Sequence, residues 1–535
     1  RVATRDAFGR IERRLEEVRP ADRPDQAAPP TPETRPAPGQ AAPLGGFILS
    51  AVVVEGSTVF EQKDFAPLYE DLLAERMGQS EIATLTEAIT QKYREAGHVL
   101  SRAVVPPQRV VGGVLRVQVI EGYVDDVEIV GARHARQRLA GYFKGVRRAR
   151  PLALAELERA LLLLSDVPGI TVVDSTLEPK TAPGAFRLRV QVERDTVEGV
   201  AYLDNRGTPD AGPLQSWTSL AANSALGHDE QILLGLFTNP IDPEELVYIE
   251  AQYLQPIGHN GTKLRITTSH ASADSGGQLA ASDTESTSQN IELRLTQPVL
   301  RTRDRSLWLH GTFDWFDQQE DRFGRTNFED RLRVARLGAE WWQPDLWKGS
   351  FYINAEASQG LDVFGASESG RANLSRFDGG GEFTKAELEV RRIQRLTDRV
   401  SVLAKAKGQL SAEPLLSYEE FALGGSAYGR GYDFGEISGD DGAAGLIEIR
   451  LDGTPDLEWL TRWQLYGFYD LGTVWNDGLD GEFARQSLAS AGVGVRLTLA
   501  RNVFAGLEVA KPLTRTPETE GDKGPRAFFT LSAQF

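Results

Sequence analysis

Val493-Gly494-Val495-Arg496-Leu497-Thr498-Leu499 carries the clearest fold signal in this chain, because apolar side chains alternate strictly with glycine and polar residues. Successive side chains of a β-strand point to opposite faces, so this pattern predicts a strand with one apolar and one polar face. Similar segments of about ten residues recur roughly sixteen times between residues 197 and 535, separated by Gly, Pro, Asn and Asp. The last segment ends at Phe535, which allows the sheet to close without a free edge.

The alternating faces are compatible with two architectures. In a soluble sandwich the polar face meets water, whereas in a membrane barrel the apolar face meets lipid and the polar face lines a lumen. The number of strands, the long glycine-rich loops and the C-terminal aromatic residue favour the barrel. No run of about twenty apolar residues occurs, so the sequence contains no candidate transmembrane helix. We therefore predict a mainly β fold with a sixteen-stranded antiparallel transmembrane β-barrel at residues 197–535.

The composition narrows the classes of function. A chain of 535 residues is too long for one ordinary domain. The net charge of −17 argues against a nucleic-acid binder, which needs a basic surface. The chain has no cysteine, which suits an oxidising compartment. It begins at Arg1 among charged residues, which predicts a processed chain without its leader.

The first 46 residues are predicted to contain a helix and a linker. Residues 1–19 have the spacing of an amphipathic helix, and Pro20 ends it. Residues 20–46 are rich in Pro, Ala and charge, which predicts an extended linker without a core. The narrow apolar stripe of the helix consists of Phe8, Ile11, Leu15 and Val18.

Two similar units, at residues 47–121 and 122–196, follow the linker. Each has the order strand, helices, strand, strand, and this repetition indicates an internal duplication. A small sheet covered by helices on one face is the economical packing for such a unit. Helical spacing predicts a helix in each unit, and Gly97 is expected to end the first one. The residues at this spacing are Ile82, Leu85, Ile89 and Tyr93 in the first unit, and Leu154, Leu157, Leu161 and Leu164 in the second. The strands are predicted at 47–54, 99–105 and 114–120 in the first unit, and at 123–130, 170–177 and 186–192 in the second.

Patterns typical of enzymes and metal sites are missing from the sequence. The Gly379-Gly380-Gly381 run has no phosphate-loop lysine. The pair Asp440-Asp441 lies in a glycine-rich loop, where we expect a solvated turn. We therefore predict no enzyme, no catalytic residue, no metal and no cofactor. The histidines are scattered without the spacing of metal ligands: His98, His134, His228, His259, His270 and His310.

Two short motifs indicate a specific contact inside the predicted barrel. A glycine-rich loop at residues 424–442 contains Gly429-Arg430-Gly431-Tyr432, and a later strand contains Phe468-Tyr469-Asp470-Leu471-Gly472. The glycines permit a tight or left-handed backbone around Arg430. If Tyr469 and Leu471 face lipid, strand parity places Asp470 in the lumen. Arg430 and Asp470 are then expected to form a charge-assisted pair; the alternative is a solvated arginine in an ordinary turn.

The chain resembles the transporter component of two-partner (type V) secretion systems. This is the TpsB type, the filamentous-haemagglutinin and haemolysin secretion/activation family, within the outer-membrane assembly-factor superfamily. Gly429-Arg430-Gly431-Tyr432 resembles the loop-6 motif of that superfamily, commonly VRGY, with Gly429 in the valine position. This departure leaves the packing of the loop tip in doubt. Phe468, Asp470 and Gly472 match the F-x-D-x-G strand motif.

The resemblance extends over nearly the whole chain. It implies a plug helix at 1–19, a linker at 20–46, POTRA domains at 47–121 and 122–196, and a barrel at 197–535 with loop 6 at about 424–442. The further similar stretches are Tyr93-Arg94-Glu95-Ala96-Gly97, Ser101-Arg102-Ala103, Pro106-Pro107-Gln108, Gly113-Val114-Leu115 through Glu121-Gly122, Leu162 through Gly169, and Asp204-Asn205-Arg206-Gly207 at the turn after the first barrel strand.

The resemblance also implies a function. Such a protein is a monomeric pore in the lipid of a Gram-negative outer membrane, with POTRA domains in the periplasm. It recognises a large exoprotein through the N-terminal secretion domain of that partner, and passes it unfolded through the lumen. The POTRA edges then bind the client by strand addition or act only as spacers, and residues 1–19 plug the lumen or form a loose tail.

Two other readings of the whole chain remain open at this point. An outer-membrane assembly factor shares the loop-6 and strand motifs, but usually carries more POTRA units and no preceding helix. A passive porin or adhesin barrel needs no periplasmic modules, although here they make up about a third of the chain.

Overall fold

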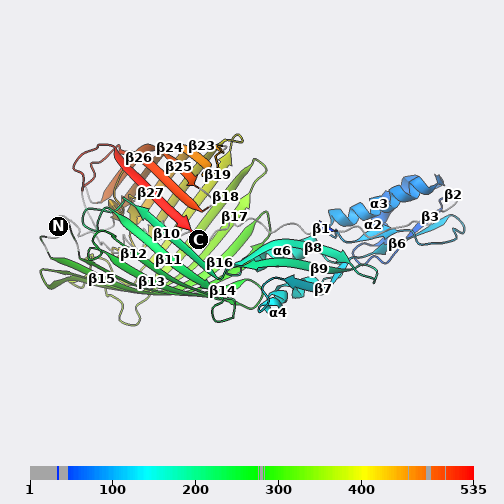
Figure 1. The fold of residues 1–535 in the computed structure, drawn as a ribbon, viewed down its shortest axis with the longest axis horizontal. Coiled ribbons are helices and arrows are strands. Elements are labelled where there is room, and N and C mark those ends of the chain that lie inside the picture. The colour runs from blue at the N-terminus through cyan, green and yellow to red at the C-terminus, as the bar shows by residue number, and fades with distance from the viewer. Residues whose placement is uncertain are drawn as a thin grey trace. The chain divides into compact units, whose positions relative to one another are not determined.

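The fold is taken from a computed structural model, which describes residues 46–274, 276, 281, 283–455, 457–476, 484–499 and 502–535, and the backbone of 33–34. Sixteen strands form one closed barrel in sequence order, from β10 to β27 (Figure 1). This closure confirms the predicted mainly β fold with a sixteen-stranded barrel. The helix predicted at 1–19, with Phe8, Ile11, Leu15 and Val18, lies outside the described residues.

The barrel strands are β10 (Val197–Asp204), β11 (Gln215–Asn223), β12 (Gln231–Thr238), β13 (Val247–Ile257), β14 (Thr262–Asp274), β15 (Thr284–Arg301), β16 (Ser306–Arg322), β17 (Arg325–Pro344), β18 (Gly349–Gly360), β19 (Thr384–Arg395), β20 (Val400–Ser411), β23 (Asp441–Gly453), β24 (Leu460–Trp475), β25 (Arg485–Leu499), β26 (Val503–Pro512) and β27 (Arg526–Gln534).

The first and last strands close the barrel. β10 pairs antiparallel with β27 from Val200↔Gln534 to Asp204↔Thr530. Beyond this ladder, the backbone N–H of Gly199 donates to the carbonyl of Phe535 at 2.7 Å. A Cβ atom on Gly199 would lie 2.3 Å from the Phe535 ring, so the C-terminal aromatic side chain covers a position where only glycine fits. The closed ladder leaves no strand edge that needs protection.

The two faces of the strands have the predicted chemistry. On β24, Leu465, Tyr469 and Leu471 are 47%, 42% and 49% exposed on the outer face of the barrel. Phe468 and Asp470, between them in the sequence, are 6% and 0% exposed. Strand parity therefore places Asp470 toward the lumen, as predicted. Among the described residues, no helix has the length and hydropathy needed to cross a membrane.

The first module contains a small sheet of order β3-β6-β5. β3 (Ala51–Glu55) runs parallel to β6 (Val114–Ile120), and β5 (Arg102–Val104) runs antiparallel to it. The predicted strand at 47–54 is broken into β2 (Phe47–Ile48) and β3, because β2 turns away to pair with β4 (Arg76–Met77). The helices are α2 (Gln62–Phe65), η1 (Ala66–Leu68), η2 (Glu70–Leu72) and α3 (Gln79–Glu95).

Helix α3 buries the residues that its spacing predicts. Leu85, Ile89 and Tyr93 are at most 1% exposed and face the sheet. The helix ends before Gly97, whose φ of +86° is the left-handed conformation typical of a glycine after a helix. Apolar periodicity and one glycine thus define this element from the sequence alone.

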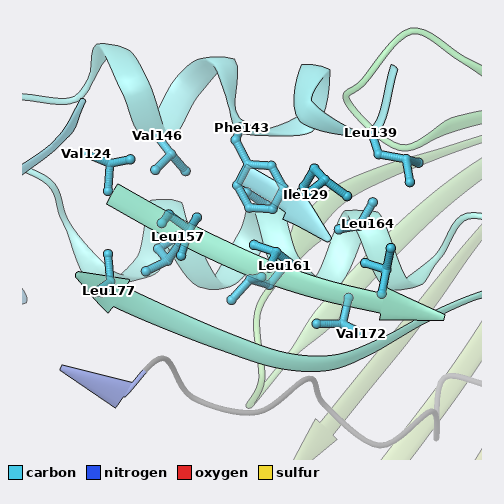
Figure 2. Packing of buried hydrophobic residues seen from close by; sticks show 14 of the residues in the cluster. Val124, Ile129, Leu139, Phe143, Val146, Leu157, Leu161, Leu164, Val172 and Leu177 are labelled. Carbon is cyan, nitrogen blue, oxygen red and sulfur yellow. The ribbon is translucent and has the colours of Figure 1, made fainter. Parts of the chain in front are cut away.

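The second module has the sheet order β1-β8-β9-β7. β7 (Tyr123–Val130) runs parallel to β9 (Ala185–Arg194), and β8 (Ile170–Pro179) runs antiparallel to β9. Figure 2 shows Phe143, Leu157 and Leu161 packed between the helices and the sheet. The helices are α4 (Arg136–Leu139), η3 (Ala140–Phe143), α5 (Lys144–Arg148) and α6 (Leu154–Ser165).

The predicted linker contributes one strand to this sheet. β1 (Glu33–Thr34) pairs in parallel with β8, with Glu33 opposite Thr176 and Thr34 opposite Leu177. The segment predicted to be only an extended linker therefore includes a two-residue strand on the edge of the second module.

The two modules are joined by hydrogen bonds. The N–H of Leu154 donates to the carbonyl of Gly97 at 2.8 Å, and the ring nitrogen Nδ1 of His98 lies 3.2 Å from the carbonyl oxygen of Leu152. Leu100 of the first module also belongs to the apolar core of the second. This junction makes one compact unit of the two modules.

The connection between β20 and β23 differs from the prediction. It spans residues 412–440, whereas 424–442 was predicted, and Gly442 already belongs to β23. Within it, β21 (Phe421–Leu423) and β22 (Ile437–Gly439) pair as a short ribbon. Phe421–Leu423 has the composition of a strand, which is why the start of the loop was predicted too late. We call this connection loop 6, with residues 412–423 and 437–440 as its stem and 424–436 as its tip.

Candidate functional site

The tip of loop 6 places Arg430 against the inner wall of the barrel. Arg430 is 4% exposed. Gly429 before it has a φ of +83°, a conformation that side chains with a Cβ atom rarely adopt. A Cβ atom at 429 would also lie 2.7 Å from Leu488 Cδ1. Glycine in the position where the motif usually has valine therefore fits this tip, which answers the doubt about its packing.

Arg430 contacts three carboxylates from three wall strands. Its Nη1 atom lies 2.8 Å from Glu448 of β23 and 3.3 Å from Glu508 of β26. Its Nε atom lies 3.3 Å from Asp470 of β24. The structure therefore brings the two predicted residues, Arg430 and Asp470, together and adds two acids that the sequence did not single out.

The backbone of the tip is bonded to the same wall. The N–H of Arg430 donates to Asp470 Oδ2 at 3.1 Å, and the N–H of Gly431 donates to Ser490 Oγ of β25 at 3.2 Å. The hydroxyl of Ser490 in turn donates to the other oxygen of Asp470. Both oxygens of this carboxylate are thus used, one by the loop and one by the wall.

Phe468 and Gly472, on either side of Asp470 in the sequence, also contact loop 6. The guanidinium carbon of Arg430 lies 3.4 Å from the centre of the Phe468 ring, a cation–π contact. A Cβ atom on Gly472 would lie 2.5 Å from Leu423 Cδ1 of the stem. In the strand motif, Phe468 therefore supplies an aromatic ring for Arg430, Asp470 supplies a negative charge, and Gly472 leaves space for Leu423.

Tyr432 completes the predicted motif as a buried anchor. Its side chain is 1% exposed, and its hydroxyl donates to the carbonyl of Ala489 at 3.1 Å. The same oxygen accepts the backbone N–H of Arg515 at 3.2 Å. Tyr432 therefore connects the tip to β25 and to the connection that follows β26.

Arg206 is a site residue that sequence reasoning noted only as part of a turn motif. Its Nη2 atom lies 2.6 Å from Glu508, and its Nη1 donates to the carbonyl of Arg430 at 3.5 Å. It also lies over the Phe528 ring at 4.0 Å. Glu508 of β26 is therefore a shared partner of Arg206 and Arg430. Through it, the connection after the first barrel strand contacts a strand near the end of the barrel.

Glu448 is shared in the same way. Arg496 of β25 lies 2.8 Å from its Oε1 atom, and Arg450 lies 2.6 Å from that oxygen. Each buried carboxylate of the site thus faces more than one donor, as buried charges require. The sequence shows Glu448 and Glu508 only as charged residues on the polar face of alternating strands. Alternation does not tell which strands contact the same loop, so the sequence could not identify them as partners of Arg430.

The expectation of a solvated turn at Asp440-Asp441 is wrong for Asp440. Asp440 is fully buried, and its carboxylate pairs with Arg376 and accepts the N–H of Leu415 at 2.7 Å. Asp441 is the first residue of β23, and its side chain accepts the N–H of Ser411 at 2.7 Å. The loop folds into the barrel, so a glycine-rich sequence that would be solvated at a surface becomes buried.

This arrangement suits mechanical retention better than catalysis. In the part of the chain that the structure describes, no group of His, Cys, Asp and Glu is arranged to hold a metal ion. Removing one partner of a buried charge pair typically costs about 3–5 kcal/mol, because the remaining charge stays buried without compensation. A loop held by such contacts stays in place until water or another charge replaces them.

Comparison with protein families shows to which family the chain belongs. The haemolysin secretion/activation protein family ShlB/FhaC/HecB matches residues 186–497. This match covers more than half of the chain. The chain belongs to this family. A POTRA domain of the ShlB type matches residues 47–122, so we call the first module POTRA 1. The second module, whose central strand is likewise flanked by one parallel and one antiparallel strand, is called POTRA 2.

Individual relatives are similar over most of their length. The outer membrane transporter CdiB of Dickeya dadantii (strain 3937) is 24% identical over 491 residues, which cover 88% of this chain and 85% of that protein. The heme/hemopexin transporter protein HuxB of Haemophilus influenzae is 20% identical over 463 residues, covering 84% and 80%. The solved structure of CdiB from Escherichia coli has a TM-score of 0.76 at 21% identity, covering 99% and 98% of the two chains.

These matches confirm the resemblance to two-partner secretion transporters. The protein is an outer-membrane transporter, and its POTRA domains lie in the periplasm. It belongs to a family of transporters. The role of Arg430 and its partners stays a prediction.

Proposed function

We propose that this protein recognises one large exoprotein in the periplasm and passes it unfolded through the barrel to the cell surface. The observation that carries the proposal is the buried contact of Arg430 with Glu448, Asp470 and Glu508 inside a closed barrel. A loop that these ion pairs fix in the lumen closes the pore. The loop is released when water hydrates Arg430 and its three carboxylates. A passive pore has no need for such a contact.

The direct test is secretion by variants that lack the contact. The exoprotein encoded beside this gene is coexpressed, and its amount in the medium is compared with the amount of folded barrel in the outer membrane. Asp470→Ala leaves Arg430 poorly compensated, so secretion is expected to fall at least about tenfold while the barrel still inserts. Normal secretion by this variant and by Arg430→Ala would sink the contact model.

The client is proposed to enter through the POTRA sheets by strand addition. The edge strand β8 already accepts β1 in parallel, which supports the idea that this edge pairs with an extended segment. The equivalent strand β5 of POTRA 1 is the other edge of a three-stranded sheet. We propose that an extended segment of the N-terminal secretion domain of the client pairs with one of them.

Proline scanning distinguishes strand addition from a spacer role. A proline lacks the backbone N–H, so it removes one ladder bond with little change elsewhere on an edge strand. Thr176→Pro on β8 is expected to weaken client binding. Gln137→Pro, at an exposed position of α4 away from the sheet edge, is the control with no expected change. Normal secretion by Thr176→Pro would favour the spacer role.

The plug role of residues 1–19 is a separate proposal. Its support is the amphipathic pattern of Phe8, Ile11, Leu15 and Val18, which combines a narrow apolar stripe with dense charge. Deletion of residues 1–19 is expected to raise the conductance of the purified protein in planar bilayers. Unchanged conductance would contradict the plug role of residues 1–19, but it would not contradict the proposed secretion function.

The same secretion assay separates this function from outer-membrane assembly. An assembly factor that fails leaves many barrel proteins poorly inserted, whereas a dedicated transporter affects one exoprotein. We expect deletion of the gene to abolish surface display of the exoprotein and to leave the other barrel proteins at their normal levels. We further propose that the protein acts as a monomer surrounded by outer-membrane lipid.

A further inference from the structure

The stem of loop 6 is held by a second set of buried charges. The carboxylate of Glu419 lies 2.6 Å from Arg336 Nη2 of β17 and 2.7 Å from Lys385 Nζ of β19. Its backbone carbonyl accepts Lys385 Nζ and Gln409 Nε2 of β20, both at 3.0 Å. The Glu419 side chain is 2% exposed. Side chain and backbone of one stem residue are thus bound to three wall strands.

The other end of the stem is held at Asp440. Its carboxylate accepts the N–H of Leu415 at 2.7 Å, which ties the two halves of the stem together. Its backbone carbonyl accepts Gln409 Nε2 at 2.9 Å. The guanidinium of Arg376 pairs with the same carboxylate and lies 3.3 Å from Glu420. One arginine therefore contacts both halves of the stem.

Arg376 belongs to a different loop. It lies in residues 361–383, the connection between β18 and β19, which we call loop 5. Loops 5 and 6 lie at the same end of the barrel, because the antiparallel pair β19 and β20 separates them. Loop 5 thus supplies a cation to a neighbouring loop whose own stem is acidic.

The Gly379-Gly380-Gly381 run gives loop 5 a close fit to the stem. Gly380 forms a parallel bridge with Leu415. A Cβ atom on Gly379 would lie 2.8 Å from the carbonyl oxygen of Leu415 in the stem, closer than real Cβ atoms approach backbone. Glycine at 379 therefore allows the backbones of loops 5 and 6 to touch. A Cβ atom on Gly381 would lie 2.9 Å from the carbonyl oxygen of Ser367, so Gly381 allows a close contact within loop 5. The glycine run, which lacks the lysine of a phosphate-binding loop, thus has a structural role in this contact.

Apolar contacts strengthen the same junction. Leu374 and Phe383 of loop 5 share one buried cluster with Leu415 and Leu416 of the stem. In the same cluster, Phe316 of β16 stacks on Tyr418 with ring centres 3.8 Å apart. Burial of apolar side chains adds a contact that hydration does not release, unlike the charges at the tip.

The tip is connected to this stem through glycines. Gly424 and Gly425 have φ values of +112° and +90°, and Gly435 at the other side has a φ of +65°. The charges that hold the tip lie on β23, β24 and β26, whereas those that hold the stem lie on β17, β19 and loop 5. The ion pairs of the tip and of the stem are therefore built from different parts of the wall, and the glycines lie between the two sets. Tyr428 and Tyr432 of the tip share one apolar cluster with Phe421, Leu423 and Ile437 of the stem.

We propose that loop 5 clamps the stem of loop 6, so that opening at Arg430 releases the tip alone. Arg376 and Glu419 are positioning residues in this view, since they act on the client only by keeping the stem on the wall. The clamped stem keeps the tip close to its three carboxylates, which favours its return after a client has passed. The proposal rests on the proposed function, in which the tip leaves the lumen wall during secretion.

Two single-cysteine reporters test the clamp without any client. The chain has no cysteine, so each reporter is the only thiol. Leu488→Cys lies under the tip and Leu416→Cys under the clamp, and the native leucines are 1% and 0% exposed. The rate of modification by a maleimide is measured for each reporter in purified protein in detergent micelles. Heat-modifiable migration in gels verifies that every variant has a folded barrel.

The clamp predicts that a tip variant and a clamp variant expose different reporters. Arg430→Ala is expected to raise modification of the Leu488→Cys reporter at least about tenfold and to leave the Leu416→Cys reporter unchanged. Arg376→Ala combined with Glu419→Gln is expected to raise modification of the Leu416→Cys reporter by a similar factor. Arg371→Ala in loop 5, which removes an ion pair with Glu368 at 55% and 66% exposure, is the matched control with no expected change.

Two outcomes would overturn the proposal. If Arg430→Ala exposes both reporters equally, loop 6 moves as one body and there is no clamp. If the double variant leaves the Leu416→Cys reporter protected, loop 5 does not hold the stem. Because no client is present, these results are independent of the secretion assay.

Discussion

POTRA 2 and the tip of loop 6 are held by opposite means. POTRA 2 buries apolar residues such as Phe143, Leu161 and Val190 in one continuous core. The tip buries Arg430 among carboxylates on a polar wall. Apolar burial is lost only when the module unfolds, because exposed apolar surface has no favourable alternative in water. Separated charges recover much of their free energy through hydration, which is the basis of our proposal that the tip opens while the barrel stays folded.

The largest effect is expected in the apolar core. Phe143→Ala should lower the free energy of unfolding of POTRA 2 by about 3–5 kcal/mol, because it removes a fully buried ring and leaves a cavity. Urea unfolding of the compact segment 46–195, followed by circular dichroism, measures this change. Arg148→Ala on the exposed surface of α5 is the control, and an equal loss in both variants would contradict the role of the core.

A smaller effect is expected when one charge of the tip is neutralised. Glu448→Gln keeps the shape of the side chain and leaves Asp470 and Glu508 beside Arg430. We expect the tip to be weakened by about 1–3 kcal/mol, the range for lost bonds to charged groups. The Leu488→Cys reporter measures this as faster modification, while the thermal stability of the barrel stays the same.

If barrel melting and tip opening change together in Glu448→Gln, the tip and the wall are one cooperative unit. The contrast between a releasable tip and a permanent core would then be lost. Glu340→Gln is a suitable control, because Glu340 of β17 is paired with Arg294 of β15 at 3.1 Å and belongs to neither anchor.

The glycine at the tip offers a test of backbone strain. Gly429→Val restores the residue that the motif usually has, but the φ of +83° is unfavourable for a β-branched residue. A left-handed conformation costs roughly 1–2 kcal/mol for such residues. We expect faster modification of the Leu488→Cys reporter and reduced secretion. Unchanged values for both would show that the tip adapts to valine without strain.

The smallest effect is expected at an exposed ion pair of POTRA 2. The Lys180 ammonium, 2.6 Å from Asp125, lowers the pKa of this carboxyl below its usual value. A lowered folded pKa means that the pair stabilises the module above the unfolded pKa, and that this contribution is lost as pH falls through the folded pKa. Lys180→Ala should thus reduce stability slightly at pH 7 and have no effect in strong acid. Urea midpoints at both pH values provide the measurement.

Much of this fold was readable from local patterns. Alternating residues such as Val493, Val495 and Leu497 predicted barrel strands, and their number predicted the size of the barrel. Helical spacing at Leu85 and Ile89 predicted α3, and Gly97 its end. These predictions succeeded because strand and helix periodicity are properties of neighbouring residues.

The failures concern residues whose surroundings come from distant parts of the chain. Asp440 looked like a solvated turn residue, but Arg376 of another loop covers it. The start of loop 6 was placed too late because β21 has the composition of a strand. The short strand β1 was missed because its pairing with β8 depends on a sheet edge more than a hundred residues away.

The sequence by itself determined which side chains face the lumen, because parity along one strand follows from the backbone. It placed Asp470 inward and identified Arg430 as its candidate partner. Only the tertiary structure decided that Glu448, Glu508 and Arg206 join them, since barrel closure brings β10 beside β27 and the fold of loop 6 sets its depth. Such convergence depends on strand order and shear, which involve the whole barrel and cannot be read from any single segment.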